Sequence, residues 1–251
     1  GAPRDLHSFP TRRSSDLTEI MVSKQPVVGI ISSGNELAEP GQPLKPGQIY
    51  DANRFSIAGQ AKEAGASVKD YGIVPDDLDS IKGILDKASQ ECDVIITSGG
   101  VSVGDYDLVK QALSGLGSMN FWQVKQKPGK PLAFGHINGK PVVGLPGNPV
   151  SSMVVCDQYM RPLLLKMQGC QDILKKTISA VCDHDIRKQP GRTEFLRARV
   201  EWREGAYHAS LTGPQGSGIL TSMVEADGLM ILPEESGEVK KGDKVNVEFF
   251  G

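Results

Sequence analysis

The stretch that decides the fold is Thr97-Ser98-Gly99-Gly100-Val101-Ser102-Val103-Gly104-Asp105-Tyr106-Asp107. It follows an apolar run at residues 92–96 that predicts a buried strand. The apolar residues after it recur at helical spacing, at Leu108, Val109, Ala112, Leu113 and Leu116. A strand, a loop rich in glycine and hydroxyl groups, and a helix together present backbone N–H groups to an anion. Because the loop also carries two aspartates, it predicts a phosphorylated ligand with a divalent cation between the phosphate and the carboxylates.

Length and composition narrow the class of protein. A chain of 251 residues accommodates one large domain or two modest ones. It is 39% hydrophobic and 23% charged, which is ordinary for a soluble globular protein. The net charge of -2 gives no electrostatic case for nucleic acid or for an anionic membrane. No apolar run approaches the roughly 20 residues that span a bilayer. We therefore expect small-molecule ligands, with no nucleic-acid partner and no membrane partner.

The cysteines form neither a CxxC pair nor a zinc-type spacing; they are Cys92, Cys156, Cys170 and Cys182. This pattern indicates reduced thiols in a cytoplasmic protein.

The first 17 residues stand apart from the rest. They are polar, contain Arg12-Arg13-Ser14-Ser15, and lack the apolar segment of a signal peptide. Residues 6–17 resemble translated sequencing-adaptor sequence, so we expect a non-native or disordered tail. A genuine flexible arm is the alternative.

Predicted strands and helices alternate between residues 25 and 169. The predicted strands are 27–32, 66–74, 92–96 and 119–124, and the predicted helices are 55–64, 78–88, 108–116 and 149–167. Asn138-Gly139 predicts a tight hairpin between residues 131–134 and 141–145. Repeated β-α-β units with continuous apolar strands indicate a mostly parallel sheet covered by helices on both faces. In such sheets the ligand binds at the carboxyl ends of the strands.

After Gly169 the sequence pattern no longer alternates between strands and helices. Short alternating or β-branched runs predict strands at 178–182, 194–202, 207–211, 228–232 and 244–249. We therefore predict a tail at residues 1–17, an α/β domain at 18–170, and a small all-β domain at 171–251.

Polar groups follow each predicted strand of the α/β domain, and parallel strands bring these groups to one edge. They are Glu36, Asp76, Asp77, Ser98, Asp105 and Asp107. A second glycine-containing loop, residues 144–151, opens a helix with free N–H groups that suit an oxyanion. Three lysines lie between the two loops, at Lys125, Lys127 and Lys130. Carboxylates beside a phosphate call for a bridging cation, and Mg²⁺ is the natural choice because it takes oxygen ligands.

Plainer roles compete for several of these residues. Asp77 and Asp105 are each placed to cap a helix. Glu36 is a single surface carboxylate unless the first strand neighbours the third, and the lysines suit a solvated loop. Other chemistries have weak support, because the chain lacks both a G-x-S-x-G elbow and a P-loop.

Taken in order, these motifs resemble the MoeA family of molybdopterin molybdenumtransferases. The matching segments are residues 32–37, 49–53, 75–77, 97–107, 127–131 and 144–151, followed by 192–197 and 215–218. The resemblance implies a molybdopterin-binding, MogA-like α/β domain followed by the family's C-terminal β domain. It also implies that this chain corresponds to the last two domains of the family, with the N-terminal domains missing.

The resemblance further implies a reaction in which adenylylated molybdopterin and molybdate are consumed, the phosphoanhydride is hydrolysed with Mg²⁺, and AMP leaves. It implies catalytic roles for Glu36, Asp76, Asp107, Lys127 and Lys130, with Glu36, Asp76 and Asp107 also holding Mg²⁺. The residues that it assigns to binding substrate are Ser98, Gly99, Gly100, Ser102, Gly147, Asn148, Ser151, Arg192 and Arg197.

The family works as a homodimer whose cleft uses both subunits, so dimerisation and turnover of this chain depend on what the missing domains supply. A molybdopterin adenylyltransferase would be a possible partner. Three other functions stay open: binding of molybdopterin without turnover, adenylyl transfer to molybdopterin, and a scaffold role.

Overall fold

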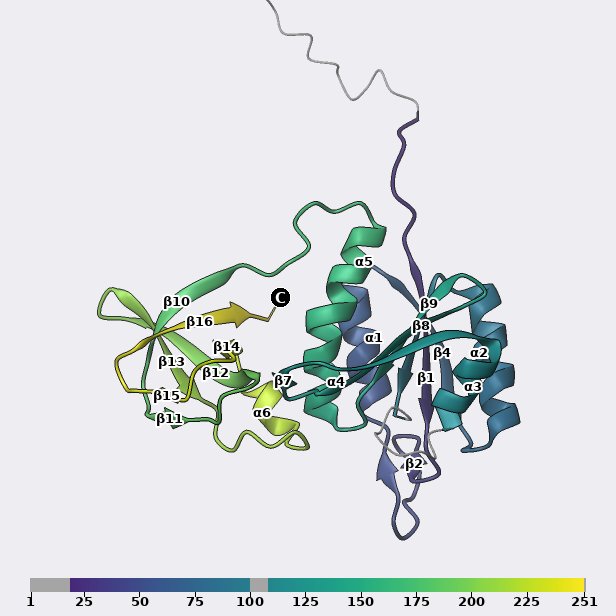
Figure 1. Cartoon of the computed structure of the whole chain (residues 1–251), viewed down its shortest axis with the longest axis horizontal. Coiled ribbons are helices and arrows are strands. Elements are labelled where there is room, and N and C mark those ends of the chain that lie inside the picture. Colours follow the sequence, from purple (N-terminus) through teal and green to yellow (C-terminus); the bar gives the residue numbers. More distant parts are fainter. Residues whose placement is uncertain (1–18, 100–107, 251) are drawn as a thin grey trace, which may run out of the picture.

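The protein consists of an α/β domain and a small β barrel joined by one linker (Figure 1). Figure 1 shows the computed structural model, which describes residues 19–99 and 108–250. The linker runs between the last helix of the first domain, which ends at Met167, and the first barrel strand, which begins at Thr177. The predicted boundary near Gln171 falls within this linker.

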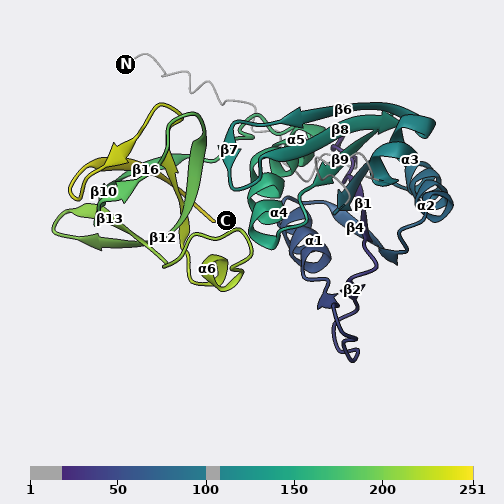
Figure 2. The same ribbon diagram turned by 60° about the horizontal axis from the view of Figure 1, so that its bottom comes forward.

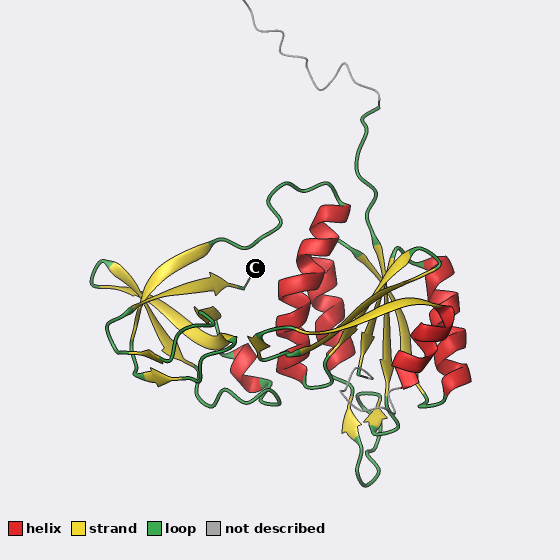
Figure 3. Ribbon diagram, in the orientation of Figure 1, coloured by secondary structure: helices red, strands yellow, loops and turns green. Residues whose placement is uncertain are grey.

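A six-stranded sheet forms the centre of the α/β domain (Figure 3). Its order is β4 (Ser67–Val74), β1 (Val27–Ser33), β5 (Val94–Ser98), β9 (Lys140–Leu145), β8 (Pro131–Ile137) and β6 (Gly117–Gln123). The first four strands are parallel, and β8 runs antiparallel to both of its neighbours. The predicted mostly parallel sheet is confirmed.

Helices cover both faces of this sheet (Figures 1 and 2). One face packs against α1 (Asn53–Glu63) and a long helical run made of α4 (Pro149–Val155), η2 (Cys156–Met160) and α5 (Arg161–Met167). The other face packs against α2 (Leu78–Glu91) and α3 (Leu108–Leu116). The helix predicted over residues 149–167 is therefore continuous, but η2 adds a π-helical turn that the apolar spacing did not indicate.

Local turn chemistry sets several of these boundaries. Gly65, just after α1, has φ +83°, a conformation that glycine adopts without a steric penalty. In the hairpin between β8 and β9, Asn138 has φ 50° and Gly139 has φ 75°, as a type I′ turn requires. The Asp77 side chain accepts a hydrogen bond from the Ser80 backbone N–H at 2.8 Å. The capping role of Asp77 at the start of α2 is thereby confirmed.

Five strands of the second domain close into a barrel. Their order is β13 (Ala206–Leu211), β10 (Thr177–Cys182), β16 (Lys244–Phe249), β14 (Gly228–Leu232) and β12 (Thr193–Arg203), and β12 pairs in turn with β13. The five strand predictions for this domain are confirmed within a few residues. A short pair, β11 (Ile186–Arg187) with β15 (Glu238–Val239), and one helical turn, α6 (Thr221–Val224), complete the domain.

Besides β11 and β15, three further two-residue strands escaped prediction, because strands of this length are too short to show alternation. β2 (Leu37–Ala38) pairs with β3 (Ile49–Tyr50) in the segment that projects from the carboxyl edge of the sheet (Figure 1). β7 (Gln126–Lys127) belongs to the α/β domain by sequence, yet it pairs with the first residues of β12. The barrel sheet therefore extends onto the first domain.

The two domains also share an apolar interface. Val150 and Val154 of α4 pack against Phe195, Met223 and Leu229 of the barrel domain. Around this interface Gln158 donates to Glu248 at 2.8 Å, and Lys175 of the linker pairs with the buried Asp157 at 2.8 Å. These contacts fix the barrel against one end of the helical layer (Figure 2).

Of the four cysteines, three are buried and Cys170 is exposed. Burial raises the pKa of Cys156 to about 12, which makes its thiol unreactive at neutral pH. In the described part of the chain, no helix is both long and apolar enough to cross a membrane.

The cap at the start of α2 gives a first prediction. Asp77→Ala should lower the Tm by about 2–4 °C at neutral pH, because the Ser80 N–H loses its acceptor. Hydrogen bonds from the Ser80 hydroxyl and from the Ser80 backbone N–H hold the pKa of Asp77 below its ordinary value. A carboxylate with a lowered pKa stabilises the fold only while ionised, so the Tm difference should shrink as the pH falls below about 4.

Calorimetric scans of the wild type and the variant between pH 7 and pH 3 measure this difference. Asp79→Ala, in the same exposed turn, is the matched control and should change the Tm less. Equal shifts for the two variants at every pH would show that the cap contributes nothing.

Candidate active site

A cavity of about 980 Å³ opens at the carboxyl edge of the six-stranded sheet, where the two domains meet. Its walls come from both domains, because residues 192 and 215–217 of the barrel domain line it together with loops of the α/β domain. Nine of the predicted site residues line this cavity: Glu36, Asp76, Gly99, Lys127, Lys130, Gly147, Asn148, Ser151 and Arg192. Residues from six separate chain segments thus meet at this edge, and the loops after β1, β4, β5 and β9 lie where the strand-end rule predicts.

Two carboxylates form the acidic side. Glu36 follows β1 and Asp76 follows β4, its parallel neighbour. Their loops are tied together, because the Asn35 N–H donates to Asp76 Oδ2 at 3.1 Å and the Asp76 N–H donates to Asn35 Oδ1 at 3.4 Å. Glu36 and Asp76 form no ion pair with any residue that the structure describes. Both carboxylates are therefore free to receive a cation.

Three cationic side chains form the basic side: Lys127, Lys130 and Arg192. Lys127 Nζ lies 3.3 Å from the buried carboxylate of Glu194, and the pairing of β7 with β12 sets this contact. Lys125, the third lysine of the predicted group, does not line the cavity. It pairs with Glu234 at 2.7 Å, and that contact raises the pKa of Lys125 above its ordinary value.

The first glycine loop reaches the cavity through Gly99. A Cβ atom on Gly99 would lie 3.0 Å from the Ser33 carbonyl oxygen, and its φ is +83°, so a side chain there would be strained. Ser98 is buried, and its hydroxyl accepts a hydrogen bond from the Asn53 amide at 2.9 Å. Gly100, Ser102, Asp105 and Asp107 lie outside the described residues, so their roles stay predictions.

The second glycine loop, residues 144–151, runs beside the first. Gly147 and Asn148 line the cavity before α4, and Ser151 lies buried in the first turn of that helix. Gly129 packs tightly below them, since a Cβ atom on Gly129 would meet a Val155 methyl group at 2.4 Å. The same Cβ atom would lie 3.3 Å from the Ser151 carbonyl oxygen. The lysine loop, residues 127–130, therefore contacts α4 both at its first turn and at its last residue.

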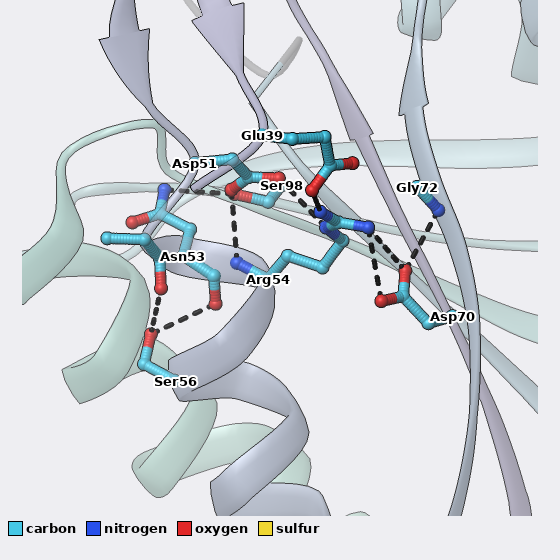
Figure 4. A network of polar contacts seen from close by, with 9 residues as sticks. Glu39, Asp51, Asn53, Arg54, Ser56, Asp70, Gly72 and Ser98 are labelled. Carbon is cyan, nitrogen blue, oxygen red and sulfur yellow. Dashed lines mark hydrogen bonds and ion pairs between the residues drawn. The ribbon is translucent and has the colours of Figure 1, made fainter. Parts of the chain in front are cut away.

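One residue that sequence reasoning did not single out, Asn53, holds the two glycine loops together. Figure 4 shows it beside Ser98 of the first loop. The Asn53 amide nitrogen donates to Ser98 Oγ at 2.9 Å and to the Gly147 carbonyl oxygen at 2.8 Å. Its amide oxygen is buried without a hydrogen-bond partner in the described structure. The motif at residues 49–53 contained this asparagine, but nothing in its spacing indicated the bridge.

The neighbouring Arg54 anchors the start of α1 (Figure 4). Its guanidinium, buried to 5% exposure, contacts three carboxylates: Asp51 at 3.1 Å, Asp70 at 2.9 Å, and Glu39. Burial opposes the positive charge, but the hydrogen bonds and charges of Asp70 and Glu39 outweigh it and raise the pKa of Arg54. Asp51 itself is only 2% exposed, so this ion pair is buried on both sides.

Arg197 differs from the prediction, which placed it on the anion. Its side chain is fully buried in the barrel domain and does not line the cavity. Desolvation lowers the pKa of Arg197 below its ordinary value. The guanidinium lies behind the cavity wall, where it donates to Ser222 and to the Gly216 carbonyl oxygen. Arg197 therefore contacts Gly216, which lines the cavity, and does not reach the cavity itself.

Two family comparisons match these domains. The family described as "Probable molybdopterin binding domain" matches residues 29–166, more than half of the chain, and "MoeA C-terminal region (domain IV)" matches residues 179–250. The chain belongs to the MoeA family.

Relatives within the MoeA family are longer than this chain. The molybdopterin molybdenumtransferase of Haemophilus influenzae is 38% identical over 252 residues, which cover 100% of this chain and 62% of that protein. Molybdopterin molybdenumtransferase 2 of Mycobacterium tuberculosis is 37% identical over 237 residues, which cover 92% of this chain and 58% of that protein. The crystal structure of the molybdopterin biosynthesis MoeA protein from Pyrococcus horikosii superposes with a TM-score of 0.77 at 34% identity, covering 90% of this chain and 55% of that one.

The Arg54 anchor of this MoeA-family site gives the second prediction. Arg54→Met should lower the free energy of unfolding by about 3 kcal/mol or more, because it leaves the buried carboxylate of Asp51 without its cation. Lys62→Met on the exposed side of the same helix is the matched control, with an expected change within about 0.5 kcal/mol.

Urea unfolding followed by circular dichroism measures both variants. Indistinguishable midpoints for Arg54→Met and Lys62→Met would mean that the three carboxylates do not depend on Arg54.

Proposed function

We propose that this chain carries out, or forms the catalytic part of a protein that carries out, molybdenum insertion during molybdenum cofactor synthesis. The substrates are adenylylated molybdopterin and molybdate, and Mg²⁺-dependent hydrolysis of the phosphoanhydride releases AMP. Membership of the MoeA family and relatives named molybdopterin molybdenumtransferase support the reaction class. Because the chain spans 62% and 58% of those relatives, activity of this chain alone is part of the proposal.

The observation that carries the proposal is the separation of charge across the cavity. Unpaired carboxylates of Glu36 and Asp76 lie on loops after β1 and β4, whereas Lys127, Lys130 and Arg192 reach the same cavity from the lysine loop and the barrel. A phosphoanhydride with molybdate needs both sides, since oxyanions bind cationic groups and a carboxylate-bound cation neutralises the phosphate.

The residues present fit Mg²⁺. Glu36 and Asp76 supply hard oxygen donors, and neither is neutralised by a described cationic side chain. Among the described residues no three acidic, histidine or cysteine side chains converge on one point, so phosphate oxygens, water or Asp107 would complete the set. When bound, Mg²⁺ polarises the phosphoanhydride and stabilises the charge on the leaving phosphate.

The protein's own groups then have distinct tasks. Lys130 and Arg192 attract the oxyanions, and Lys127 is held beside them by Glu194. The backbone at Gly99 and Gly147 allows a phosphate to approach closely, because neither residue has a side chain to obstruct it. Apolar residues complete the wall and suit the flat ring of a pterin; they are Ile49, Leu108 and Val109.

The homodimer and the handover of substrate from a molybdopterin adenylyltransferase stay predictions from the resemblance, and a cytoplasmic location stays a prediction from the cysteine pattern. Mass measurement in solution decides the first, since a monomer would leave a shared cleft incomplete.

The third prediction concerns catalysis. With adenylylated molybdopterin, molybdate and Mg²⁺, the wild type should release AMP, and chelation of Mg²⁺ by EDTA should stop it. Glu36→Gln and Asp76→Asn should each reduce the rate by about 10²-fold, because a neutral amide cannot neutralise the cation. AMP is quantified by chromatography.

Glu63→Gln, an exposed change of the same kind on α1, is the control and should keep the wild-type rate. Tight binding of adenylylated molybdopterin without AMP would reduce the function to binding. Consumption of ATP with unadenylylated molybdopterin would instead favour an adenylyltransferase.

A further inference from the structure

The least expected charge in the molecule is the Arg197 guanidinium. Arg197 has 0% of its surface exposed, yet it forms no ion pair with any carboxylate in the described part of the chain. A buried cation without a counter-charge is costly, so it persists where its hydrogen bonds serve a purpose. Arg54, the other buried arginine described above, contacts three carboxylates.

The hydrogen bonds of the Arg197 side chain all point to one loop and the turn behind it. Nε donates to Ser222 Oγ at 3.0 Å, and Nη2 donates to the Gly216 carbonyl oxygen at 3.1 Å. Ser222 Oγ donates in turn to the Ile219 carbonyl oxygen at 2.6 Å. One planar guanidinium therefore spans from α6 to the cavity wall.

The backbone of Arg197 also forms hydrogen bonds with the same loop. Its N–H donates to Gln215 Oε1 at 2.8 Å, and its carbonyl oxygen accepts from Gln215 Nε2 at 3.2 Å and from the Thr212 N–H at 3.1 Å. With the two side-chain bonds, Arg197 makes contacts at both ends of the segment 212–217. The Gln215–Ser217 loop is thus tied to the middle of β12, a strand fixed by pairing on both sides.

This loop contributes directly to the candidate site. Gln215, Gly216 and Ser217 line the cavity. The Ser217 carbonyl oxygen accepts a hydrogen bond from the Val150 N–H at 3.1 Å, at the start of α4 and next to Asn148. A continuous chain of contacts therefore runs from Arg197 through the loop to the second glycine loop of the other domain.

We propose that Arg197 is a positioning residue that holds the Gln215–Ser217 loop against the start of α4 and so sets the width of the anion-binding cavity. It acts through the loop without touching the ligand. The inference rests on the proposed function for the identity of the anion, but the geometry of the loop is independent of it.

The test compares four variants of the full chain by two measurements, and the fourth, Arg197→Lys, keeps the charge of Arg197 without its planar group. Arg197→Met keeps the length of the side chain and removes the guanidinium, and Ser222→Ala removes one acceptor at a position that does not line the cavity. Arg199→Met is the control, since Arg199 lies on the same strand with an exposed partner, Glu225. Molybdate affinity is measured by calorimetry, and exchange of the Val150 amide hydrogen is followed by mass spectrometry or NMR.

We expect Arg197→Met to weaken molybdate binding at least 10-fold and to speed Val150 exchange at least 10-fold, at a temperature where the variant is folded. Ser222→Ala should show about 3-fold changes in the same direction, and Arg199→Met should match the wild type. A role confined to the barrel core would lower the Tm while Val150, in the other domain, kept its protection.

Three results would overturn the proposal. Unchanged Val150 exchange in both Arg197→Met and Ser222→Ala is the first, and if Arg197→Met does not fold, Ser222→Ala decides alone. Unchanged molybdate affinity despite faster exchange is the second. The third is an Arg197→Lys variant with the molybdate affinity and the Val150 exchange rate of the wild type. A positive charge alone, without the two hydrogen bonds of the guanidinium, would then be enough to position the loop. If the wild type binds no molybdate, the proposed function loses support, while Val150 exchange still decides the positioning role.

Discussion

The first turn of α1 is the constraint on which the candidate site depends. Arg54 is buried against Asp51 and reaches Asp70 on β4 and Glu39 on the projecting segment, so one guanidinium joins a helix, a strand and a loop. With the helix start fixed, the adjacent Asn53 amide can hold Ser98 and Gly147 at hydrogen-bond distance simultaneously. The two glycine loops, which are separate in sequence, are thereby kept at a set distance on either side of the space where an anion would lie.

The second constraint comes from the other domain. β7, which contains Lys127, pairs with β12 of the barrel and not with the sheet of the α/β domain. As a result Lys127, which lines the cavity, forms an ion pair with the buried Glu194. The apolar contacts of Val150 and Val154 with Phe195 and Met223 press the barrel onto α4 in the same region. A cavity wall that combines two domains is as rigid as their interface, and here that interface includes strand pairing, apolar burial and ion pairs.

Periodicity and turn chemistry predict the elements of this fold because each element buries a face whose pattern is local. The strand at residues 94–98, the helix at 108–116 and the Asn138-Gly139 turn all follow from neighbours in sequence. The strand-end rule then places Glu36, Asp76 and Gly99 at one edge without knowledge of any contact. β7 could not be predicted, since it is two residues long and its pairing partner, β12, belongs to the second domain. The π-helical turn η2 leaves no trace in the apolar spacing of residues 149–167. Asn53 was missed because its two acceptors lie 45 and 94 residues away in the sequence.

The two buried arginines show why residue type alone cannot assign a role. Arg54 directly follows the motif at residues 49–53, Arg197 ends the motif at residues 192–197, and both are buried. Arg54 is surrounded by carboxylates, so its charge is balanced within the fold and its contribution is to the stability of the helix start. Arg197 has only neutral hydrogen-bond partners, Ser222 and a backbone carbonyl oxygen, so its charge is unbalanced in the described structure. One of these partners is the carbonyl oxygen of Gly216, a residue that lines the cavity. The difference lies in counter-charge, which a sequence does not display.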